Sequence, residues 1–467
     1  MCQVSKTEKL GKPKFNAIND IIAGTIMAAT SVPQLVAYAE TVGYASYRGL
    51  ATAGPSLFAW GLATGSPFMS CGVTSITALM AKSDLGGESY IQEKGEEEYV
   101  KLVAVYSIWV GICSSLLGIL GFGKLASLVP KTVSKGFKWG CAVGVIASAI
   151  PNGLFSKGSS ELKERVAESA VGALVTFCKT NMPAATGAVS VTNLLFGITH
   201  PNLWGIIPAA LFLVSTWFVM KGPKFLPKCL PPGTEVIIAT AVATLLSMNF
   251  EYPGGIVGEI PQLDADAGIK LGPIKIPVSV MSPKELLDVD IVGQFGGSYV
   301  ALIVTATLFA AVNFLSIMSI ASGFETENGI AWSAPRELIS QGVACGVAGF
   351  TGSAPVSASM SRSLVSRMAG TTSQFSCMVT ALIWIYLMPI MSIMSSCPKA
   401  ALSAVIASAV VKSVVYPKDL LAMKGADFIV GWGTGIATAI SSPTIGFGIG
   451  VILYTVCGQF KPKEKTA

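Results

Sequence analysis

The sequence has little charge. Of its 467 residues only 12% are charged, whereas 52% are hydrophobic and the mean hydropathy is +0.63. A typical soluble protein carries about 25% charged residues, so 32 basic and 26 acidic side chains cannot coat a chain of this length. This shortage excludes a soluble enzyme, a disordered scaffold and a nucleic-acid binder with a dominant basic face. It indicates a polytopic membrane protein.

Metal-ligating residues are also scarce. His200 is the only histidine, and the ten cysteines are scattered without a Cys-x-x-Cys pair. Zinc, iron–sulfur and haem sites need clustered ligands, so we expect no metal and no cofactor. The sequence contains no convergent catalytic set, phosphate-binding glycine motif or nucleophile elbow, so we expect no enzyme. Residues 1–16 lack the apolar core of a signal peptide and are expected to form a retained cytoplasmic tail.

Long apolar runs fill most of the chain. A bilayer core about 30 Å thick takes about 20 apolar helical residues per crossing. Runs can be separated near residues 17–40, 49–65, 68–82, 99–122, 136–151, 204–220 and 233–250, and again near 297–322, 334–350, 356–368, 374–395, 399–413, 426–440 and 443–458. We therefore expect seven plus seven spans, separated by a polar extracellular loop over residues 251–296. The amphipathic segment at residues 162–178 is expected on the surface or as a re-entrant piece.

Charge is distributed unevenly between the loops of this topology. With both termini inside, the inner loops and tails hold 19 Lys/Arg and 9 Asp/Glu, and the outer loops hold 12 and 17, with Arg362 set apart inside a span. An excess of basic residues on the cytoplasmic side is the rule for membrane proteins. The sequence therefore predicts cytoplasmic termini, including a second tail at residues 459–467.

Two segments break the helical pattern at matching places in the two halves. The first reads Gly-Ser-Pro-Phe-Met-Ser-Cys-Gly-Val-Thr over residues 65–74, and the second reads Gly-Ser-Ala-Pro-Val-Ser-Ala-Ser-Met-Ser-Arg over residues 352–362. Each precedes an apolar helix too short to cross the membrane alone. Such paired interruptions indicate a midplane transport site between inverted repeats. Helix N-termini that meet there present N–H groups and positive dipole ends, which attract an anion.

Arg362 stands in the second break, beside Ser359, Ser361 and Ser363. An arginine at mid-membrane costs about 2.5–3.5 kcal/mol on insertion scales, so it implies a partner. Two interpretations stay open. Either the transported anion is that partner, or Arg362 lies a turn nearer the cytoplasm and binds helix carbonyls or lipid phosphate.

These segments carry a resemblance to a known family. The run Arg-Glu-Leu-Ile-Ser-Gln-Gly at residues 336–342, followed by the break through Ser-Arg-Ser-Leu-Val at 361–365, is similar to the signature of the SulP anion transporters. Residues 20–24 (Asp-Ile-Ile-Ala-Gly) and 32–39 (Val-Pro-Gln-Leu-Val-Ala-Tyr-Ala) resemble the first helix of that family. Weaker matches lie at residues 257–261 and 446–451, so the similarity covers about residues 17–458.

The resemblance implies an all-α fold of about 14 transmembrane helices in two inverted repeats, at residues 17–250 and 297–458, divided into core and gate domains. The third and tenth helices are then half-helices, each preceded by a short strand, and the anion lies between their N-termini. Transport proceeds by an elevator-like movement of the core. Carried onto this chain, the substrate-binding positions are Gln34, Tyr38, Gly72, Val73, Thr74, Ser316, Ser361 and Arg362.

Three of these positions also have structural interpretations. Gln34 either binds the anion or satisfies a carbonyl freed by Pro33, because a lone amide in lipid is costly. Tyr38 is either a ligand or a packed wall of the site. Thr74 caps the third helix, touches the anion, or does both.

Ser316 stands where proton-coupled or sodium-coupled relatives commonly carry an acid. A hydroxyl neither exchanges a proton near neutral pH nor supplies a formal charge, so the resemblance implies exchange or uniport of sulfate, bicarbonate or chloride, with proton symport disfavoured. The alternative is a voltage-responsive, prestin-like protein with little transport. Related uracil and xanthine transporters usually carry acids on the eighth and tenth helices, which this chain lacks at Ser316 and Arg362.

Most of the family carries a cytoplasmic STAS domain after the last helix, and this chain stops about ten residues past that point. Whether the gene lacks that domain or the chain was cut is left open. The expected partners are a small inorganic anion and the lipid bilayer, without nucleic acid, and a homodimer through the membrane domain is left open. The plasma membrane is the expected location.

Overall fold

The computed structural model describes residues 13–121, 130–181, 186–227, 234–258, 269–271, 274–387 and 395–459. The predicted terminal tails therefore lie largely outside the described residues. The described chain is mostly helical, and its strands are short. The elements before residue 250 are α1 (Ala17–Val42), α2 (Arg48–Ala51), α3 (Ala53–Ala63), β1 (Cys71–Gly72), α4 (Ser75–Asp84), α5 (Gly87–Lys94), α6 (Glu96–Ile119), α8 (Lys131–Leu154), α9 (Ser159–Ala167), α10 (Ala170–Asn181), α11 (Thr186–Thr199), η1 (Pro201–Leu203), α12 (Ile206–Phe225) and α13 (Thr234–Asn249).

The second half of the chain begins with a small hairpin and returns to helices. Its elements are β2 (Ile269–Leu271), β3 (Ile274–Ile276), α14 (Pro283–Leu287), α15 (Ile291–Gln294), α16 (Tyr299–Asn328), α17 (Ala334–Phe350), β4 (Ser357–Ala358), α18 (Met360–Met368), α19 (Phe375–Leu387), α20 (Lys399–Val415), α21 (Lys418–Leu421), α22 (Ala426–Ile440) and α23 (Pro443–Gln459). The predicted polar loop thus contains β2, β3, α14 and α15. Part of that loop, residues 259–268 and 272–273, lies outside the described residues.

Several helices have the length and composition of membrane spans. In the described part of the chain, four segments suffice to cross a bilayer, at Ala17–Val42, Glu96–Ile119, Tyr299–Glu325 and Lys399–Leu421, and further apolar helices are shorter. One of the shorter helices, α11, was not predicted, because Ser190, Thr192 and Asn193 interrupt its apolar run. The amphipathic segment at residues 162–178 forms parts of α9 and α10.

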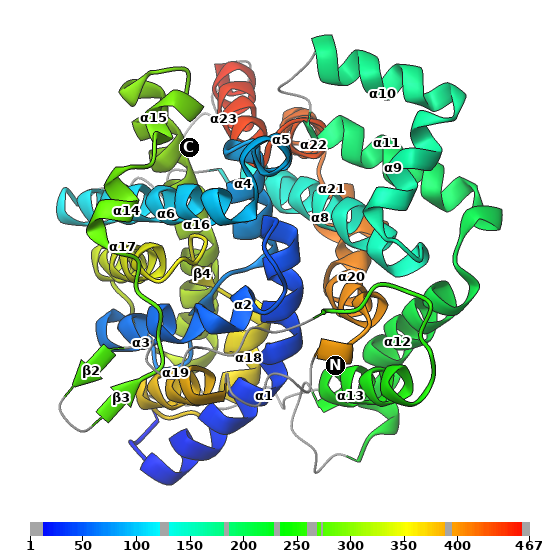
Figure 1. Cartoon of the computed structure of the whole chain (residues 1–467). Coiled ribbons are helices and arrows are strands. Elements are labelled where there is room, and N and C mark those ends of the chain that lie inside the picture. Colours follow the sequence, from blue (N-terminus) through cyan, green and yellow to red (C-terminus); the bar gives the residue numbers. More distant parts are fainter. Residues whose placement is uncertain are drawn as a thin grey trace.

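The helices gather into two bundles, mostly on the left and right of Figure 1, with α23 near the middle. The first contains α1–α6 and α14–α19, and its packing is centred on α6 against α17 and on α3 against α19. The second contains α8–α13 and α20–α23, centred on α8 against α20 and α22. We refer to these as the first and second bundles.

Small residues allow the closest helix contacts in both bundles. A Cβ added to Gly111 of α6 would lie 2.7 Å from the carbonyl oxygen of Gly342 in α17. In the second bundle, a Cβ on Gly136 of α8 would lie 2.1 Å from the carbonyl oxygen of Gly431 in α22. Such close backbone approach is typical of helix association in lipid, where no hydrophobic effect drives helices together.

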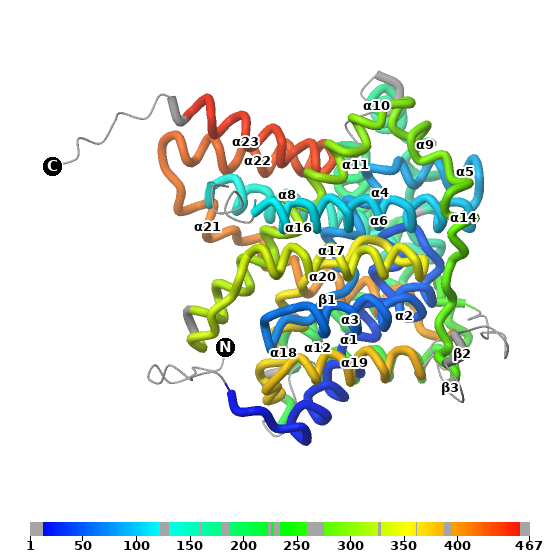
Figure 2. Tube along the Cα trace, turned by 90° about the vertical axis from the view of Figure 1, so that its left-hand side faces the viewer, coloured from blue at the N-terminus to red at the C-terminus, as the bar shows by residue number. Residues whose placement is uncertain are grey.

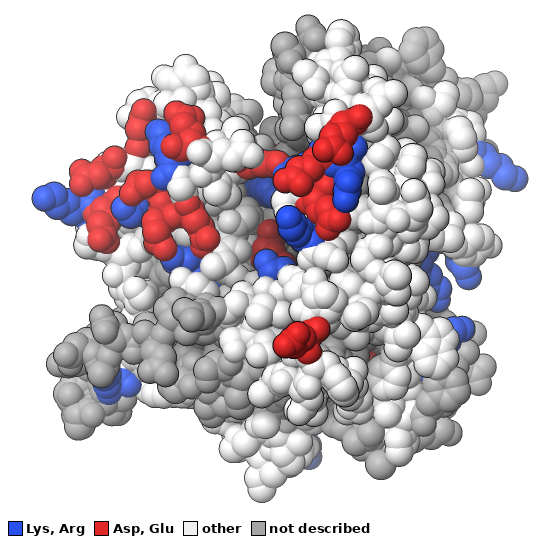
Figure 3. Space-filling model, turned by 45° about the vertical axis from the view of Figure 1, so that its right-hand side comes forward, with Lys and Arg blue, Asp and Glu red and all other residues white. Residues whose placement is uncertain are grey.

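The two ends of the described chain lie on the same side of the molecule, on the left of Figure 2, while α2, α5, α14 and the β2–β3 hairpin lie on the opposite side. We call that opposite side the loop face. Figure 3 shows acidic and basic side chains gathered into groups on an otherwise largely uncharged surface.

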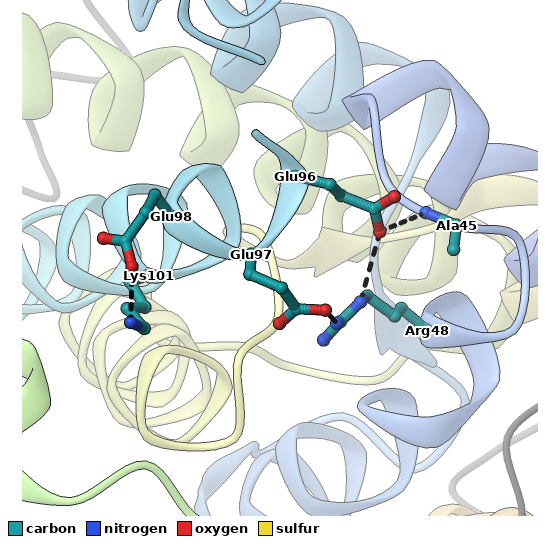
Figure 4. A network of polar contacts seen from close by, with 6 residues as sticks. All are labelled: Ala45, Arg48, Glu96, Glu97, Glu98 and Lys101. Atoms are coloured by element: carbon teal, nitrogen blue, oxygen red, sulfur yellow. Dashed lines mark hydrogen bonds and ion pairs between the residues drawn. The ribbon is translucent and has the colours of Figure 1, made fainter. Parts of the chain in front are cut away.

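An ion-pair network on the loop face joins α2 to the start of α6 (Figure 4). The guanidinium of Arg48 contacts Glu97 and, at 3.3 Å, Glu96, while Lys101 contacts Glu98 at 2.6 Å. The three glutamates begin α6, where negative charge complements the positive end of the helix dipole. The network therefore stabilises the helix start and anchors α2 to it.

Candidate anion site

Strands β1 and β4 pair across the first bundle although 284 residues, 73–356, lie between them. Cys71 pairs with Ala358 and Gly72 with Ser357 in an antiparallel register. The main chain extends this pairing, because Ser359 N donates to Ser70 O at 2.9 Å. Both predicted short strands are thus present, each directly before a short helix, and their pairing brings the starts of α4 and α18 together.

The start of α4 is capped by its own hydroxyl groups. The Thr74 hydroxyl accepts a hydrogen bond from Thr77 N at 3.3 Å, and Thr74 N donates to the Thr77 hydroxyl at 2.9 Å. This reciprocal pair is a capping box and confirms the capping role expected for Thr74. At the other helix, Ser359 occupies the N-cap of α18, and the hydroxyl of Ser363 accepts from Ser70 N at 3.1 Å.

Arg362, in the first turn of α18, crosses from one break to the other. Its side chain is 2% exposed, and both Nη atoms donate to the carbonyl oxygen of Val73, at 3.3 and 3.2 Å. Its Nε–H, by contrast, has no hydrogen-bond partner among the described residues. The guanidinium thus holds the end of β1 and retains hydrogen-bonding capacity beside two helix N-termini.

Gly72 makes room for this guanidinium. A Cβ at Gly72 would lie 3.0 Å from Nη2 of Arg362, and the φ of Gly72 is +157°. The close approach of Arg362 and the positive φ both favour glycine at this position.

Helix α1 supplies the next wall. Tyr38 is buried, and its hydroxyl is hydrogen-bonded to the side chain of Ser75 at the start of α4 and lies within the field of the Arg362 charge. Gln34 lies one turn earlier on α1, and its buried Oε1 has no hydrogen-bond partner in the described structure. An unsatisfied buried amide oxygen is costly, which favours a ligand or water near Gln34.

Helix α16 closes the far side of the strand pair. The amide of Asn313 donates to Val356 O at 2.8 Å, and the hydroxyl of Ser357 donates to Asn313 O at 3.4 Å. The half-buried Ser316 lies three residues further along α16, on the same helix face as Asn313. The structure therefore places Ser316 one turn beyond the contact between α16 and β4.

Two buried acids hold loops next to the site: Glu337 holds the start of the first break, and Asp20 holds the loop that follows α18. Glu337 accepts from the Thr64 hydroxyl at 2.7 Å and from Gly65 N at 2.9 Å, while the neighbouring Arg336 donates to the carbonyls that end α3. Asp20, also fully buried, accepts four hydrogen bonds from the backbone and hydroxyls of Thr372 and Ser373 after α18. Asp20 and Glu337 both belong to the segments that resemble the SulP family, at residues 20–24 and 336–342, and these contacts give them a structural role.

The structure brings most of the sequence-predicted positions together. Gly72, Val73, Thr74, Tyr38 and Arg362 surround the junction of α4 with α18, which we call the helix junction. The other three predicted residues are less tightly placed. Gln34 and Ser316 lie on flanking helices, and Ser361 lies in α18, although its side chain is outside the described part.

Two neighbours of the junction, Ser363 and Asn313, were absent from the predicted set. Ser363 belongs to the Ser-Arg-Ser run, and Asn313 is an amide within an apolar span, so both carried a signal in the sequence. The guanidinium of Arg362 gives the junction positive charge and an N–H donor that no described residue engages, while the buried acids Glu337 and Asp20 are engaged in loop contacts. Such an arrangement suits an anion.

Comparison with known proteins gives a consistent result. A model of the sulfate permease family matches residues 18–433. Among curated relatives, a probable sulfate transporter of Mycobacterium tuberculosis is 27% identical over 85% of this chain and 61% of its own length. Human solute carrier family 26 member 6 is 23% identical over 93% of this chain and 54% of its own. The chain thus spans little more than half to three-fifths of the length of these relatives.

Solved structures share the fold. The structure of SLC26A9 has a TM-score of 0.74 and 20% identity, covering 95% of this chain and 65% of that one. The transmembrane domain of the cyanobacterial bicarbonate transporter BicA has a TM-score of 0.69 and 15% identity, covering 96% of this chain and 99% of that one. The chain therefore shares the fold of these two structures, and its apolar helices fit a membrane protein.

Proposed function

Because the chain belongs to the sulfate permease family, we propose that it carries small inorganic anions across a membrane and binds them at the helix junction. The observation that carries the proposal is the buried Arg362, whose guanidinium lies where α4 and α18 begin and has an N–H without a protein partner. Interrupted helices whose N-termini face each other are the typical site of anionic substrates in secondary transporters.

The proposed binding residues remain those predicted from the sequence. Arg362 supplies charge, and the backbone around Gly72, Val73 and Thr74 supplies the dipole end of α4. Tyr38 forms a wall that also touches Ser75. On the flanks, Gln34 and Ser316 offer polar groups, and Ser361 extends the first turn of α18.

The proposed transport domain has 14 helices in two inverted repeats. Support comes from contacts that recur in matched pairs between the halves. The packing of α6 on α17 corresponds to that of α3 on α19, α8 on α22 to α20 on α12, and α16 on α23 to α1 on α13. In this scheme the first bundle is the core, the second bundle is the gate, and the core moves as an elevator.

Coupling, orientation and location follow the same reasoning. The hydroxyl of Ser316 in place of an acid favours exchange or uniport over proton symport. The acid-rich loop face is proposed to be extracellular, which leaves both termini in the cytoplasm, and the plasma membrane is the proposed location. A homodimer through the membrane domain stays a prediction.

The decisive experiment is uptake by proteoliposomes. Labelled sulfate, bicarbonate and chloride are supplied outside, against several internal anions or none. Saturable uptake that depends on an internal anion supports exchange, and uptake without one supports uniport. Absence of uptake for every anion, with the protein folded, contradicts the proposal. Voltage-driven charge movement without tracer flux would favour the prestin-like alternative instead.

A further inference from the structure

Two adjoining cavities lie between the bundles, toward the loop face. The larger, about 450 Å³, is bounded by the end of α4, by α5, and by α8, α11 and α22. The smaller, about 120 Å³, reaches Ala37 of α1, the residue before Tyr38. Since a single water needs only about 10–15 Å³, the larger cavity has room for an ion with bound water. Together the cavities lead from the loop face toward the helix junction.

The charged side chains that line both cavities sum to one positive charge. They are Lys82 of α4, Lys163 of α9 and Glu88 of α5. The carboxylate of Glu88 forms an ion pair with Lys163, which leaves the charge of Lys82 as the surplus. Glu40 also lines the smaller cavity, but Lys399 lies 3.3 Å from its carboxylate. The charge balance of the cavity walls therefore favours an anion.

Several helices also begin or end at the larger cavity, and their ends carry partial charges. Residues at the starts of α5, α11 and α23, namely Gly87, Gly187 and Pro443, line the larger cavity, and each start carries partial positive charge. Helices α1, α4, α10 and α22 end at the same cavity, where Thr41, Ser83, Cys178 and Thr438 line it, and contribute partial negative charge. Lys82 lies in the last turn of α4 and offsets the negative end of that helix. The helix ends therefore give no net positive contribution, and the positive balance of the cavity walls comes from the lysine side chains.

Asn193 gives an independent indication of a ligand. Its side chain, on α11, is 9% exposed and lines both cavities. Its Oδ1 has no hydrogen-bond partner among the described residues. A buried amide oxygen without a hydrogen-bond donor is costly, and an amide turned by 180° would present its N–H groups to the cavity in place of that oxygen.

We propose that these cavities form a second anion site, separate from the helix junction, that holds a small inorganic anion on its way between the loop face and Arg362. The identity of the ligand rests on the proposed function, whereas the site itself rests on Lys82, Asn193 and the surplus positive charge. An anion here would be held by Lys82 and by the Asn193 amide, and would remain partly hydrated.

The test uses the purified full chain with the helix junction disabled by Arg362→Gln. Thermal unfolding is followed while sulfate or chloride replaces gluconate at constant ionic strength. We expect Arg362→Gln to keep a saturable, anion-dependent rise in Tm. Adding Lys82→Gln should raise the half-saturating concentration about fivefold, as for loss of a partly screened charge. Adding Lys94→Gln, a lysine of α5 whose ammonium lies over the Tyr90 ring, should leave it unchanged.

Two results would overturn the second site: no anion-dependent rise in Tm in Arg362→Gln, or a rise that Lys82→Gln leaves unchanged. Should Arg362→Gln fail to fold, Lys82→Gln and Asn193→Leu are measured alone in sided proteoliposomes. There the half-saturating concentration must rise when the anion is supplied at the loop face and stay constant from the other side. Failure of the proposed function is distinguishable, because wild-type protein would then bind anions without tracer flux.

Discussion

Replacement of Arg362 by glutamine tests the electrostatic basis of the proposed site. The guanidinium is buried, and an anion against it would lie about 4 Å from the charge. At an effective dielectric constant of about 20, that pair is worth about 4 kcal/mol. Bound water lowers this interaction energy to about 3–4 kcal/mol. Each 1.4 kcal/mol of lost interaction energy weakens the affinity about tenfold. We therefore expect the half-saturating anion concentration of Arg362→Gln to rise about a hundredfold to a thousandfold.

The same substitution also removes both hydrogen bonds to Val73 O. A buried carbonyl left without donors costs about 1–3 kcal/mol, so the Tm should fall as well. Arg362→Lys separates the two effects. It keeps the charge but loses the two-pronged geometry, so its affinity should lie between those of the wild type and Arg362→Gln.

Arg367 provides the matched control on the same helix. It donates to Asn328 Oδ1 at 3.1 Å and lies over the ring of Phe324, away from the helix junction. Arg367→Gln should therefore keep the wild-type half-saturating concentration. The assay is tracer uptake of sulfate, bicarbonate and chloride by proteoliposomes, with Tm measured in parallel. A folded Arg362→Gln protein with wild-type uptake of all three would refute the electrostatic reasoning and leave Arg362 as a clamp on Val73.

Three further predictions concern the frame of the site and the loop face. Gly72→Ala should lower both the anion affinity and the stability, the latter by about 1–3 kcal/mol. The alanine Cβ would meet Arg362, and an alanine would be strained at the φ of residue 72. Glu337→Ala should lower the free energy of unfolding by about 2–6 kcal/mol, because two buried donors lose their acceptor. In the loop helix α14, the N–H and the hydroxyl of Ser282 hold the pKa of Glu285 below its usual range. Since the folded-state pKa is the lower one, the contribution of this carboxylate to α14 is present at neutral pH and is lost as the pH falls through that value. Ser282→Ala should raise the pKa of Glu285 toward its usual range.

Each of these predictions has its own check. For Gly72→Ala, the control is Gly448→Ala in α23, where a Cβ meets nothing within 4 Å and should be tolerated; equal losses in both variants would contradict the prediction. Glu337→Ala is followed by thermal unfolding, and an unchanged Tm would show that the buried hydrogen bonds are dispensable. The pKa of Glu285 is read from its carbon-13 carboxyl shift. The titration midpoint should lie at higher pH in Ser282→Ala than in the wild type, and an unchanged or lower midpoint would contradict the prediction.

Some features of this protein follow from residues taken in order along the chain. The shortage of charge indicates a membrane protein because few ionisable groups can be hidden in lipid, and the length of apolar runs predicts spans. The two Gly-Ser breaks at residues 65–74 and 352–362 locate the short helices, since glycine, proline and hydroxylated residues interrupt helical backbone locally. Thr74 as a cap also follows from local sequence, because its partner is only three residues away.

Only the tertiary structure decided which distant groups meet. Nothing near residue 72 predicts that its strand pairs with residue 357, that Arg362 donates to Val73 O, or that Glu337 accepts from Thr64. These contacts depend on the packing of α1, α3, α16 and α17 around the breaks, and packing is set by the shapes of faces that no local pattern records. Helix α11 escaped prediction for a related reason. Ser190, Thr192 and Asn193 interrupt its apolar run, and its burial depends on α8 and α22, which lie beside it only in the folded chain.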